Sequence, residues 1–384
     1  MRYLLILILA ACLVALVVSV SCDKKNPSYL TKYITDDNPF TDDEARGCSG
    51  IPPDPSFSES DIMSDIKPEN KKIIPSAGVG LVEGTSRCVQ INISGLINPN
   101  TGDPFTPIPN KNIFIVEDGK PQGFTLVKVD ESSVALADVV FTIDNSGSMY
   151  EEADAIAAGI IAFAKELETT GLDIRFGCVG YWGNVSGAIN LTSAEKLEEY
   201  LNRNGVTGTS RTVGFSGPDS ADLMAAAPFF GPGGGENGVD AIFFADSVFS
   251  WRSGAQRHFI NFTDEPTQPN GDSVYSTDAM CADVAGRAAV HSVFSSDTGW
   301  AESPLVSEHP WRMAECTGGT QVFVAPDASD LDLSQLPIVG FLSNSYIIQF
   351  TSSDGEAVHN LKIYIFDEGA DGVIEFAEII YSGP

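Results

Sequence analysis

The sequence predicts an α/β protein in which a doubly wound, mostly parallel sheet is inserted into a small β-sandwich. Between residues 134 and 336, apolar strand patterns alternate with amphipathic helix patterns, which is typical of a sheet covered by helices on both faces. Short alternating strands precede and follow this stretch, over residues 83–133 and 337–384. Because the termini of a domain usually lie close together, inserting one domain into another is topologically simple.

The strand patterns at the two ends of this region define the predicted sandwich. CVQINISGL and NIFIVEDGKPQGFTLVKV come first, and the stretch Glu117–Lys120 is a hairpin signal between two apolar runs. Near the C-terminus, SYIIQFTSS and HNLKIYIFDE are separated by the turn Asp354-Gly355, and the run IEFAEIIY follows. We expect the strands from both ends to pair in one sandwich.

The central region begins with a nearly continuous apolar strand from Val134 to Ile143, as a sheet covered on both faces requires. A helix from about Glu151 to Thr169 follows, with its apolar residues on one stripe. Further strands are predicted at IRFGCVGYW, HFINFT, VHSVFSS and QVFVAP, and further helices at AEKLEEYLNR, NGVDAIFFADSVF, ADVAGRAAV and the stretch ending in MAEC.

The charge of the chain excludes one class of partner. Its 384 residues include 22 Lys and Arg against 52 Asp and Glu, for a formal net charge of −30. Nucleic acids and anionic membrane surfaces would be repelled by such a protein, whereas cations would be attracted. We therefore expect no nucleic acid among its partners, although a solvated acidic surface accounts for the charge equally well.

The N-terminus has the pattern of a secretory signal peptide, predicted over residues 1–21. Ser19, Val20, Ser21 and Cys22 resemble a bacterial lipobox, which implies that Cys22 is lipidated after cleavage. Cys12 follows a better consensus, but the apolar stretch before it is too short for export. An uncleaved membrane anchor is the alternative. Residues 22–82 are rich in Asp, Pro, Ser and Lys, and are expected to form a flexible tether.

Export favours oxidation of the cysteines that follow Cys22, since thiols outside the cytoplasm tend to form disulfides. Cys178 lies in an apolar strand pattern and is interpreted as a buried free thiol. The simplest pairing of the remaining four joins Cys48 to Cys88 and Cys281 to Cys316. Zinc binding is not expected, because the short CxxC spacing is absent.

The loop after the first central strand carries the residues most suggestive of chemistry. Asp144, Ser146 and Ser148 offer one carboxylate and two hydroxyls, which are hard oxygen ligands suited to Mg²⁺, Mn²⁺ or Ca²⁺. In a doubly wound sheet, ligands bind at the carboxyl ends of the strands, where this loop is predicted to lie. The alternative is a polar loop that only caps the next helix.

This DxSxS motif resembles the metal-ion-dependent adhesion site of the von Willebrand factor A family, and the resemblance spans roughly residues 135–335. It implies that Asp264, at the end of the strand HFINFT, holds the metal through water. The family usually has a Thr in a second loop; here Glu236 occupies that place, as in integrin β subunits. The resemblance therefore implies a metal site made of Asp144, Ser146, Ser148, Glu236 and Asp264.

Two further resemblances extend this interpretation. Glu151 and Glu152 stand where integrin β subunits carry acids that bind an adjacent calcium, although acids also favour the first turn of any helix. The flanking strands are similar to those of bacterial proteins in which a β-sandwich brackets a von Willebrand factor A domain. The five segments expected are a signal peptide at 1–21, a tether at 22–82, sandwich strands at 83–133 and 337–384, and the metal-binding domain at 134–336.

The function expected from these features is binding and not catalysis. The four histidines are scattered along the sequence, and neither HExxH nor GxSxG is present. A membrane-anchored lipoprotein of the cell envelope, periplasmic or on the cell surface, is expected to bind an exposed Asp or Glu of a protein ligand through Mg²⁺, Mn²⁺ or Ca²⁺. In the alternative, the metal only stabilises the loops of a structural component of an envelope complex.

Overall fold

The computed structural model describes a defined set of residues, all within the unit Phe40–Pro384: 48, 50–129, 136–169, 172–203, 215, 217–218, 221–231, 235–297, 299, 308–336, 338 and 344–383. The expected signal peptide, Cys12, the predicted lipidation site Cys22 and residues 22–47 and 49 of the expected tether lie outside it. Within the described ranges, no helix has both the length and the apolar composition of a membrane span.

A mostly parallel seven-stranded sheet forms the middle of the sequence, with the order β10-β9-β8-β7-β11-β12-β13. All neighbours are parallel except β8 and β9. The strands are β7 (Leu136–Asp144), β8 (Asp173–Trp182), β9 (Asn184–Thr192), β10 (Gly217–Pro218), β11 (Gln256–Thr263), β12 (Ala288–Phe294) and β13 (Gln321–Phe323). The α/β class and the mostly parallel sheet predicted from the sequence are confirmed.

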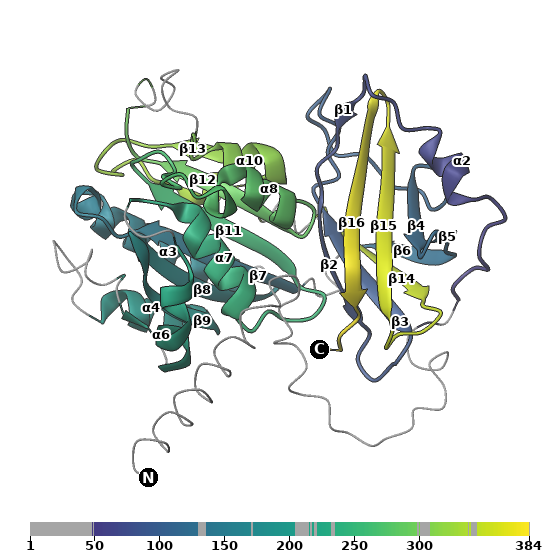
Figure 1. Ribbon diagram of the computed structural model, residues 1–384, viewed down its shortest axis with the longest axis horizontal. Helices are drawn as coiled ribbons and strands as arrows, with labels where there is room; N and C mark the ends of the chain where they lie inside the picture. Colours follow the sequence, from purple (N-terminus) through teal and green to yellow (C-terminus); the bar gives the residue numbers. More distant parts are fainter. Residues whose placement is uncertain are drawn as a thin grey trace, which may run out of the picture. The chain divides into compact units, whose positions relative to one another are not determined.

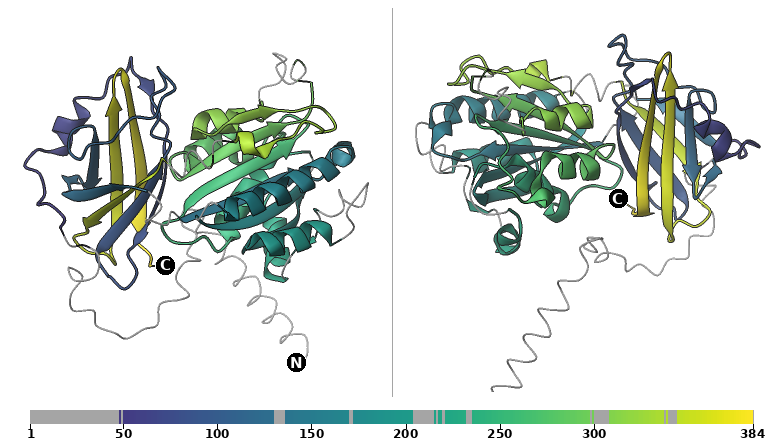
Figure 2. Two further views of the ribbon diagram at one scale, coloured as in Figure 1. Left: turned by 180° about the vertical axis from the view of Figure 1, so that it is seen from behind. Right: turned by 45° about the horizontal axis from the view of Figure 1, so that its top comes forward.

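Helices cover both faces of this sheet (Figure 1). The alternate residues of β7 enter two hydrophobic clusters, Val139 and Phe141 in one and Val140 in the other. The first cluster includes apolar residues of α3 (Ala153–Glu168) and α4 (Ala194–Asn202), which Figure 2 shows from behind. The second includes α6 (Ala221–Ala226), α7 (Gly238–Val248), α8 (Thr277–Val284) and α10 (Arg312–Thr317). Burial on both faces explains why the β7 sequence is continuously apolar.

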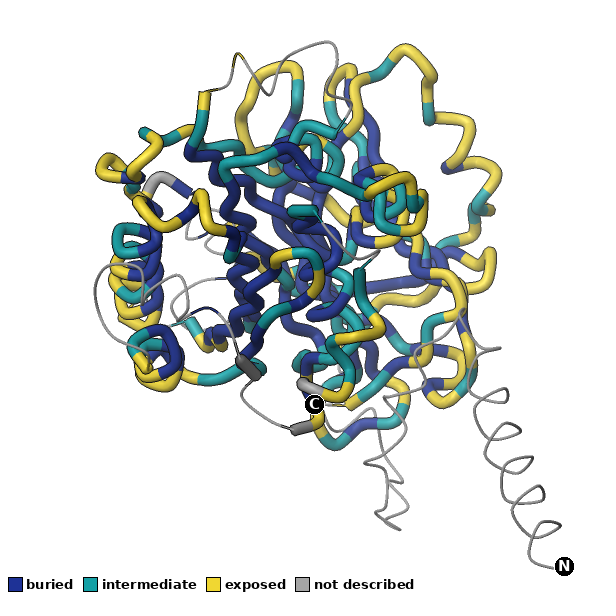
Figure 3. The backbone as a smooth tube through the Cα atoms, turned by 60° about the vertical axis from the view of Figure 1, so that its left-hand side comes forward, coloured by how far each residue is buried: buried dark blue, intermediate teal, exposed yellow. Residues whose placement is uncertain are grey.

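Two further sheets combine strands from both ends of the chain. Their orders are β1-β16-β15-β4-β5 and β2-β3-β14-β6. The first contains β1 (Lys71–Lys72), β4 (Ile113–Glu117), β5 (Lys120–Pro121), β15 (Val358–Asp367) and β16 (Ala370–Ile380). The second contains β2 (Ser76–Leu81), β3 (Cys88–Ser94), β6 (Phe124–Lys128) and β14 (Tyr346–Thr351). Apolar side chains of both sheets form one hydrophobic cluster. Along the whole backbone, buried segments lie mainly in the interior and exposed segments mainly at the periphery (Figure 3).

The hairpin signal at Glu117–Lys120 corresponds to the turn between β4 and β5. Asp118 and Gly119 have φ angles of 51° and 79°, so both adopt the left-handed conformation that two-residue hairpin turns of the primed type require. The turn at Asp354-Gly355 behaves differently. It joins β14 of one sheet to β15 of the other, so the strands on its two sides do not pair with each other.

Part of the segment expected to form a tether, residues 22–82, is folded into secondary structure. The described part of this segment contains α2 (Glu59–Met63), β1 and β2, and β2 pairs with β3. The physical reason is that β2 (SAGVGL) is a buried strand with small residues, which lacks the large side chains of a recognisable apolar pattern. A disulfide between Cys48 and Cys88 also joins this segment to β3.

Small residues in β2 permit close contact with the loops that precede β11 and β12 of the seven-stranded sheet. Ala77 donates a backbone hydrogen bond to the Gly286 carbonyl (2.9 Å). A Cβ atom placed on Gly78 would overlap the backbone carbonyl of Ala255. Gly78 therefore occupies a position where backbone meets backbone and no side chain fits.

Two other elements differ from expectation. The strand β9 (NVSGAINLT) was not predicted, because Gly, Ser and Asn weaken its strand pattern. The helix expected at ADVAGRAAV ends at Val284, since Gly286 has a φ of 85° and β12 begins at Ala288.

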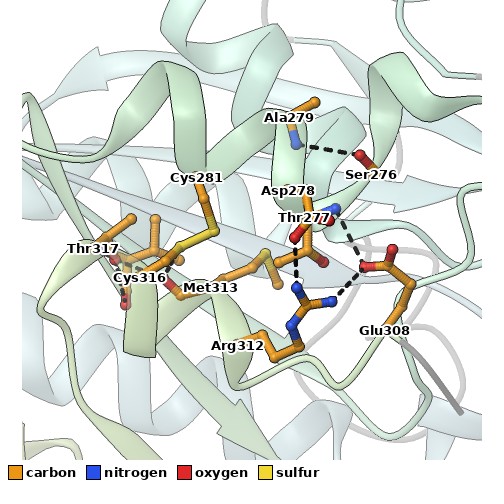
Figure 4. Close-up of a disulfide and its surroundings, with 11 residues drawn as sticks. Ser276, Thr277, Asp278, Ala279, Cys281, Glu308, Arg312, Met313, Cys316 and Thr317 are labelled. Atoms are coloured by element: carbon orange, nitrogen blue, oxygen red, sulfur yellow. Dashed lines mark hydrogen bonds and ion pairs between the residues drawn. A yellow bond between two sulfur atoms is a disulfide. The ribbon is translucent and has the colours of Figure 1, made fainter.

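The second pair of cysteines links α8 to α10. Cys281 and Cys316 form a disulfide with a Cα–Cα distance of 5.7 Å, and Arg312 forms ion pairs with Asp278 and Glu308 beside it (Figure 4). Cys178 is a buried free thiol, as expected. Both disulfide pairs are those of the simplest pairing inferred from the sequence.

Candidate metal centre

Three segments meet at the carboxyl edge of the seven-stranded sheet. Asp144 is the last residue of β7, and Asp264 directly follows the neighbouring strand β11. Glu236 precedes α7, and two backbone hydrogen bonds hold its loop in place. One runs from Gly183 N–H to the Gly235 carbonyl (2.7 Å), and the other from Gln268 N–H to the Glu236 carbonyl (3.0 Å).

The structure brings the five residues of the predicted metal site together. Carboxylate oxygens of Asp144, Glu236 and Asp264 lie within 4.8 Å of one another. The Oγ atoms of Ser146 and Ser148 are 2.9 Å apart, and Ser148 Oγ donates to Asp264 Oδ1 (3.2 Å). The hydroxyls of Ser146 and Ser148 thus lie beside the carboxylates that would be the charged ligands of a metal.

Asp144 is held by two hydrogen bonds and has no exposed surface. The backbone N–H of Ser146 donates to Asp144 Oδ1 (2.9 Å), and Thr263 Oγ1 donates to Asp144 Oδ2 (3.0 Å). Thr263 is not among the residues predicted for the site. Its one available signal was its position at the end of a strand, directly before Asp264.

The acids of this cluster are close to one another, and burial together with their mutual repulsion shifts their pKa values. Burial, together with the charges of Glu236 and Asp264, raises the pKa of Asp144 well above its usual range. Burial and the charges of Glu265 and Asp264 raise the pKa of Glu236 to about 7. Among the described residues, no ion pair involves Asp144, Glu236 or Asp264.

These residues fit a hard divalent cation. Every side-chain ligand on offer is oxygen, as Mg²⁺, Mn²⁺ and Ca²⁺ prefer. Glu236 Oε2 is buried and accepts no hydrogen bond within the described part of the chain. A buried carboxylate oxygen without a donor is costly, and a cation would remove that cost.

Glu151 and Glu152, the candidates for an adjacent metal, point to different surroundings. Glu151 is exposed and accepts a hydrogen bond from the Tyr150 hydroxyl (2.8 Å). Glu152 is buried and accepts one from Ser295 Oγ (2.8 Å), and burial raises its pKa to about 7. The structure does not bring the two carboxylates into one group with the central cluster.

A second group of close acidic and histidine side chains lies in the flanking sheets, where the sequence gave no indication of one. It consists of Glu117, Asp118 and His359. His359 Nδ1 lies 2.7 Å from Asp118 Oδ2, and Nε2 faces the Asp354 carbonyl. Because both ring nitrogens face oxygen acceptors, the geometry favours the doubly protonated imidazolium. Ser352 Oγ and the Tyr381 hydroxyl donate to Glu117 Oε1 (2.7 and 3.0 Å), so hydrogen bonds already engage this group.

Two histidines that are distant in sequence are neighbours in the structure. His258 on β11 and His291 on β12 are buried, with Nδ1 of the first 3.3 Å from Nε2 of the second. Thr320 N–H donates to His291 Nδ1, and burial lowers the pKa of His258 to about 4. Both rings are therefore neutral at pH 7 and lie within the core of the sheet.

Comparison with known proteins gave matches to solved structures alone. No family model and no curated protein matches the chain. The vWF domain of the type V pili tip protein Mfa5 from Porphyromonas gingivalis is 14% identical, with a TM-score of 0.22 over 35% of this chain and 40% of that one. The open conformation of the pilus adhesin SpaC from Lactobacillus rhamnosus GG is 10% identical, with a TM-score of 0.33 over 82% of this chain. The chain spans 48% of the length of that second protein.

Proposed function

We propose that this chain is a lipid-anchored binding protein of the cell envelope that engages an acidic group of a protein partner through a divalent cation. The observation that carries the proposal is the convergence of Asp144, Glu236 and Asp264 from three loops within 4.8 Å. Such a group of carboxylates is stable when a cation neutralises it. We further propose that binding, and not catalysis, is the role of this site.

The architecture we propose is a von Willebrand factor A-type domain inserted into one β-sandwich. The strand pairs β3–β14 and β4–β15, each between an early and a late segment of the chain, support the insertion. The hydrophobic cluster shared by the two flanking sheets supports the sandwich. The cluster of acids at the ends of β7 and β11 supports the resemblance of the loop to a metal-ion-dependent adhesion site.

The ion we propose is Mg²⁺, with Mn²⁺ or Ca²⁺ as substitutes. Asp144 and Glu236 would hold it as charged ligands, Ser146 and Ser148 as neutral ones, and Asp264 through water. When bound, the cation supplies positive charge that attracts a carboxylate of the partner. Asp144 and Glu236 together neutralise part of that charge, so this site should bind a partner carboxylate less strongly than one with a Thr in place of Glu236.

Calorimetric titration of the protein with Mg²⁺, Mn²⁺ and Ca²⁺ tests the proposal. A cation bound only by the folded state stabilises it by about 2.7 kcal/mol at a hundredfold excess over its Kd. Asp144→Ala should abolish both the binding heat and the rise in Tm, and Asp264→Ala should weaken them less. The exposed Asp103→Ala serves as the matched control and should bind like the wild type.

Two outcomes would contradict the proposal in different ways. If the wild type binds none of the three cations at millimolar concentration, the loop only caps a helix. If cations raise the Tm but a complex with a partner survives chelation unchanged, the metal stabilises the loops and does not bridge the partner.

A further inference from the structure

An apolar pocket lies beside the acidic cluster, between β9 and the helical segment that precedes α7. It has a volume of about 290 Å³ and is open to solvent. Its apolar lining consists of Val185, Ala188, Leu223, Ala227, Pro228 and Phe244. Pockets lined by apolar side chains bind the apolar groups of ligands.

The pocket and the acidic cluster are joined through one residue. Asn145 directly follows Asp144, and its Nδ2 donates to Oγ of Ser186, which also lines the pocket (3.4 Å). Standard chain dimensions across these residues put pocket and cluster within roughly 15 Å, a distance that about four or five residues of extended peptide span. One short segment of a partner can therefore reach both.

Exposed aromatic side chains belong to the same edge of the sheet. Tyr150, Trp182 and Phe229 are 50%, 62% and 79% exposed. Tyr150 lies two residues after Ser148, Trp182 ends β8, and Phe229 follows the pocket residue Pro228. Large aromatic side chains are enriched at the centres of protein interfaces, and their exposure together is typical of a binding surface.

The charge of the protein restricts the partner. With a net charge of −30, and with Glu265 next to the cluster, the surface repels a strongly acidic ligand. If one carboxylate of a ligand binds the cation, a nearby apolar residue of that ligand therefore adds affinity, whereas a second acidic residue does not.

We propose that the partner segment carries an Asp or Glu within about five residues of a large apolar side chain, and that this side chain enters the pocket. The inference rests on the proposed function, because the acid binds the cation held by Asp144. The pocket then selects among acidic segments, which the cation alone cannot do.

A phage-displayed library of random linear peptides, panned on the full chain with Mg²⁺ and eluted with a chelator, tests this inference. We expect enrichment of peptides that combine an acid with a large apolar residue at the stated spacing. Ala227→Phe places a large side chain at the rim of the pocket and fills it. The affinity for the enriched peptides should fall about tenfold, the loss expected when one apolar side chain is no longer buried. Ala225→Phe, on the exposed face of α6, is the matched control and should bind as the wild type does.

The outcomes distinguish failure of the pocket inference alone from failure of the function on which it rests. If chelator-eluted peptides share an acid but no apolar preference, or if Ala227→Phe selects the same peptides, the pocket has no role although the metal-bridged binding stands. If no peptide is eluted by the chelator, the pocket inference and the proposed function are both wrong.

A Mg²⁺-induced rise in Tm equal to that of the wild type shows that Ala227→Phe is folded. Leu223→Ala, which enlarges the pocket, should shift the preference to larger side chains.

Discussion

Glu236 is the acid of the cluster that holds a buried oxygen, Oε2, without a hydrogen bond in the described part of the chain. Burial and the nearby acids raise its pKa to about 7. At pH 8 in the absence of metal, its negative charge adds to the repulsion from Asp264 and Glu265.

Glu236→Gln should therefore have opposite effects on the two states of the protein. Without metal, loss of the repulsion should raise the Tm by about 2–4 °C, as about 1 kcal/mol does in a domain of this size. With Mg²⁺, loss of a charged ligand should weaken binding about tenfold or more. Differential scanning calorimetry with and without Mg²⁺ measures both, and Glu166→Gln, an exposed acid near the end of α3, is the matched control. A lower Tm of metal-free Glu236→Gln would show that the repulsion is unimportant.

His359 links stability to pH through its contacts with Asp118 and the Asp354 carbonyl. Burial acts to lower the pKa of His359, but these hydrogen bonds and the charges of Glu117 and Asp118 outweigh it and raise the pKa above its usual 6.5. A raised pKa means that the folded state binds the proton more tightly than the unfolded state. The contribution is therefore complete below pH 6.5 and is lost as the pH rises through the folded pKa.

His359→Gln should remove this pH dependence. The wild type should lose free energy of unfolding between pH 6 and pH 9 by an amount that the variant does not lose, of the order of 1 kcal/mol. Urea unfolding at a series of pH values measures it. Parallel curves for the two proteins over this range would mean that His359 is not held as an imidazolium.

The candidate site could be predicted from sequence where one local pattern carries the information. Asp144, Ser146 and Ser148 form such a pattern, and Asp264 stands at the end of an apolar strand. Thr263 could not be predicted, because its contact with Asp144 depends on the pairing of β7 with β11. The contacts of His359 could not be predicted either, since Asp118 lies 241 residues away.

At the scale of elements, β2 shows how a strand can be overlooked. Strands such as β7 and β11 are long and apolar and could be predicted, because burial on both faces requires that composition. β2 has two glycines in six residues, and it is specified by contacts with β3 and with the loop at Ala255. Those contacts are tertiary, and no local pattern encodes them.

Gly78→Ala should therefore destabilise the protein strongly. The added methyl would meet the backbone carbonyl of Ala255, which cannot rotate away as a side chain can. We expect a loss of about 2–3 kcal/mol in the free energy of unfolding, typical of overpacking. Urea denaturation measures it, with Gly383→Ala as the control, since nothing lies within 4 Å of the Cβ added there. Equal stability of the two variants would show that the loop at Ala255 can move.

For the whole molecule, the proposed anchor makes a prediction about location. Cys22→Ala should remove the lipidated residue and shift the protein from the membrane fraction to the soluble or secreted fraction. Cys12→Ala leaves the proposed anchor intact and should remain in the membrane fraction. Fractionation followed by immunoblotting measures this, and mass spectrometry of the N-terminal peptide detects the lipid. Retention of Cys22→Ala with release of Cys12→Ala would place the cleavage site at Cys12.

The pairing of early and late strands also decides how the protein carries mechanical tension. The chain enters the seven-stranded part after β6 and leaves it before β14, and these two strands are neighbours in one sheet. In the proposed function, a pull applied by a partner at the cation would thus be divided between two covalent connections that end on neighbouring strands. Toward the N-terminus, the bond between Cys48 and Cys88 transfers tension directly to β3. Residues 49–87 are bypassed, so β2 is protected from being peeled away strand by strand under load.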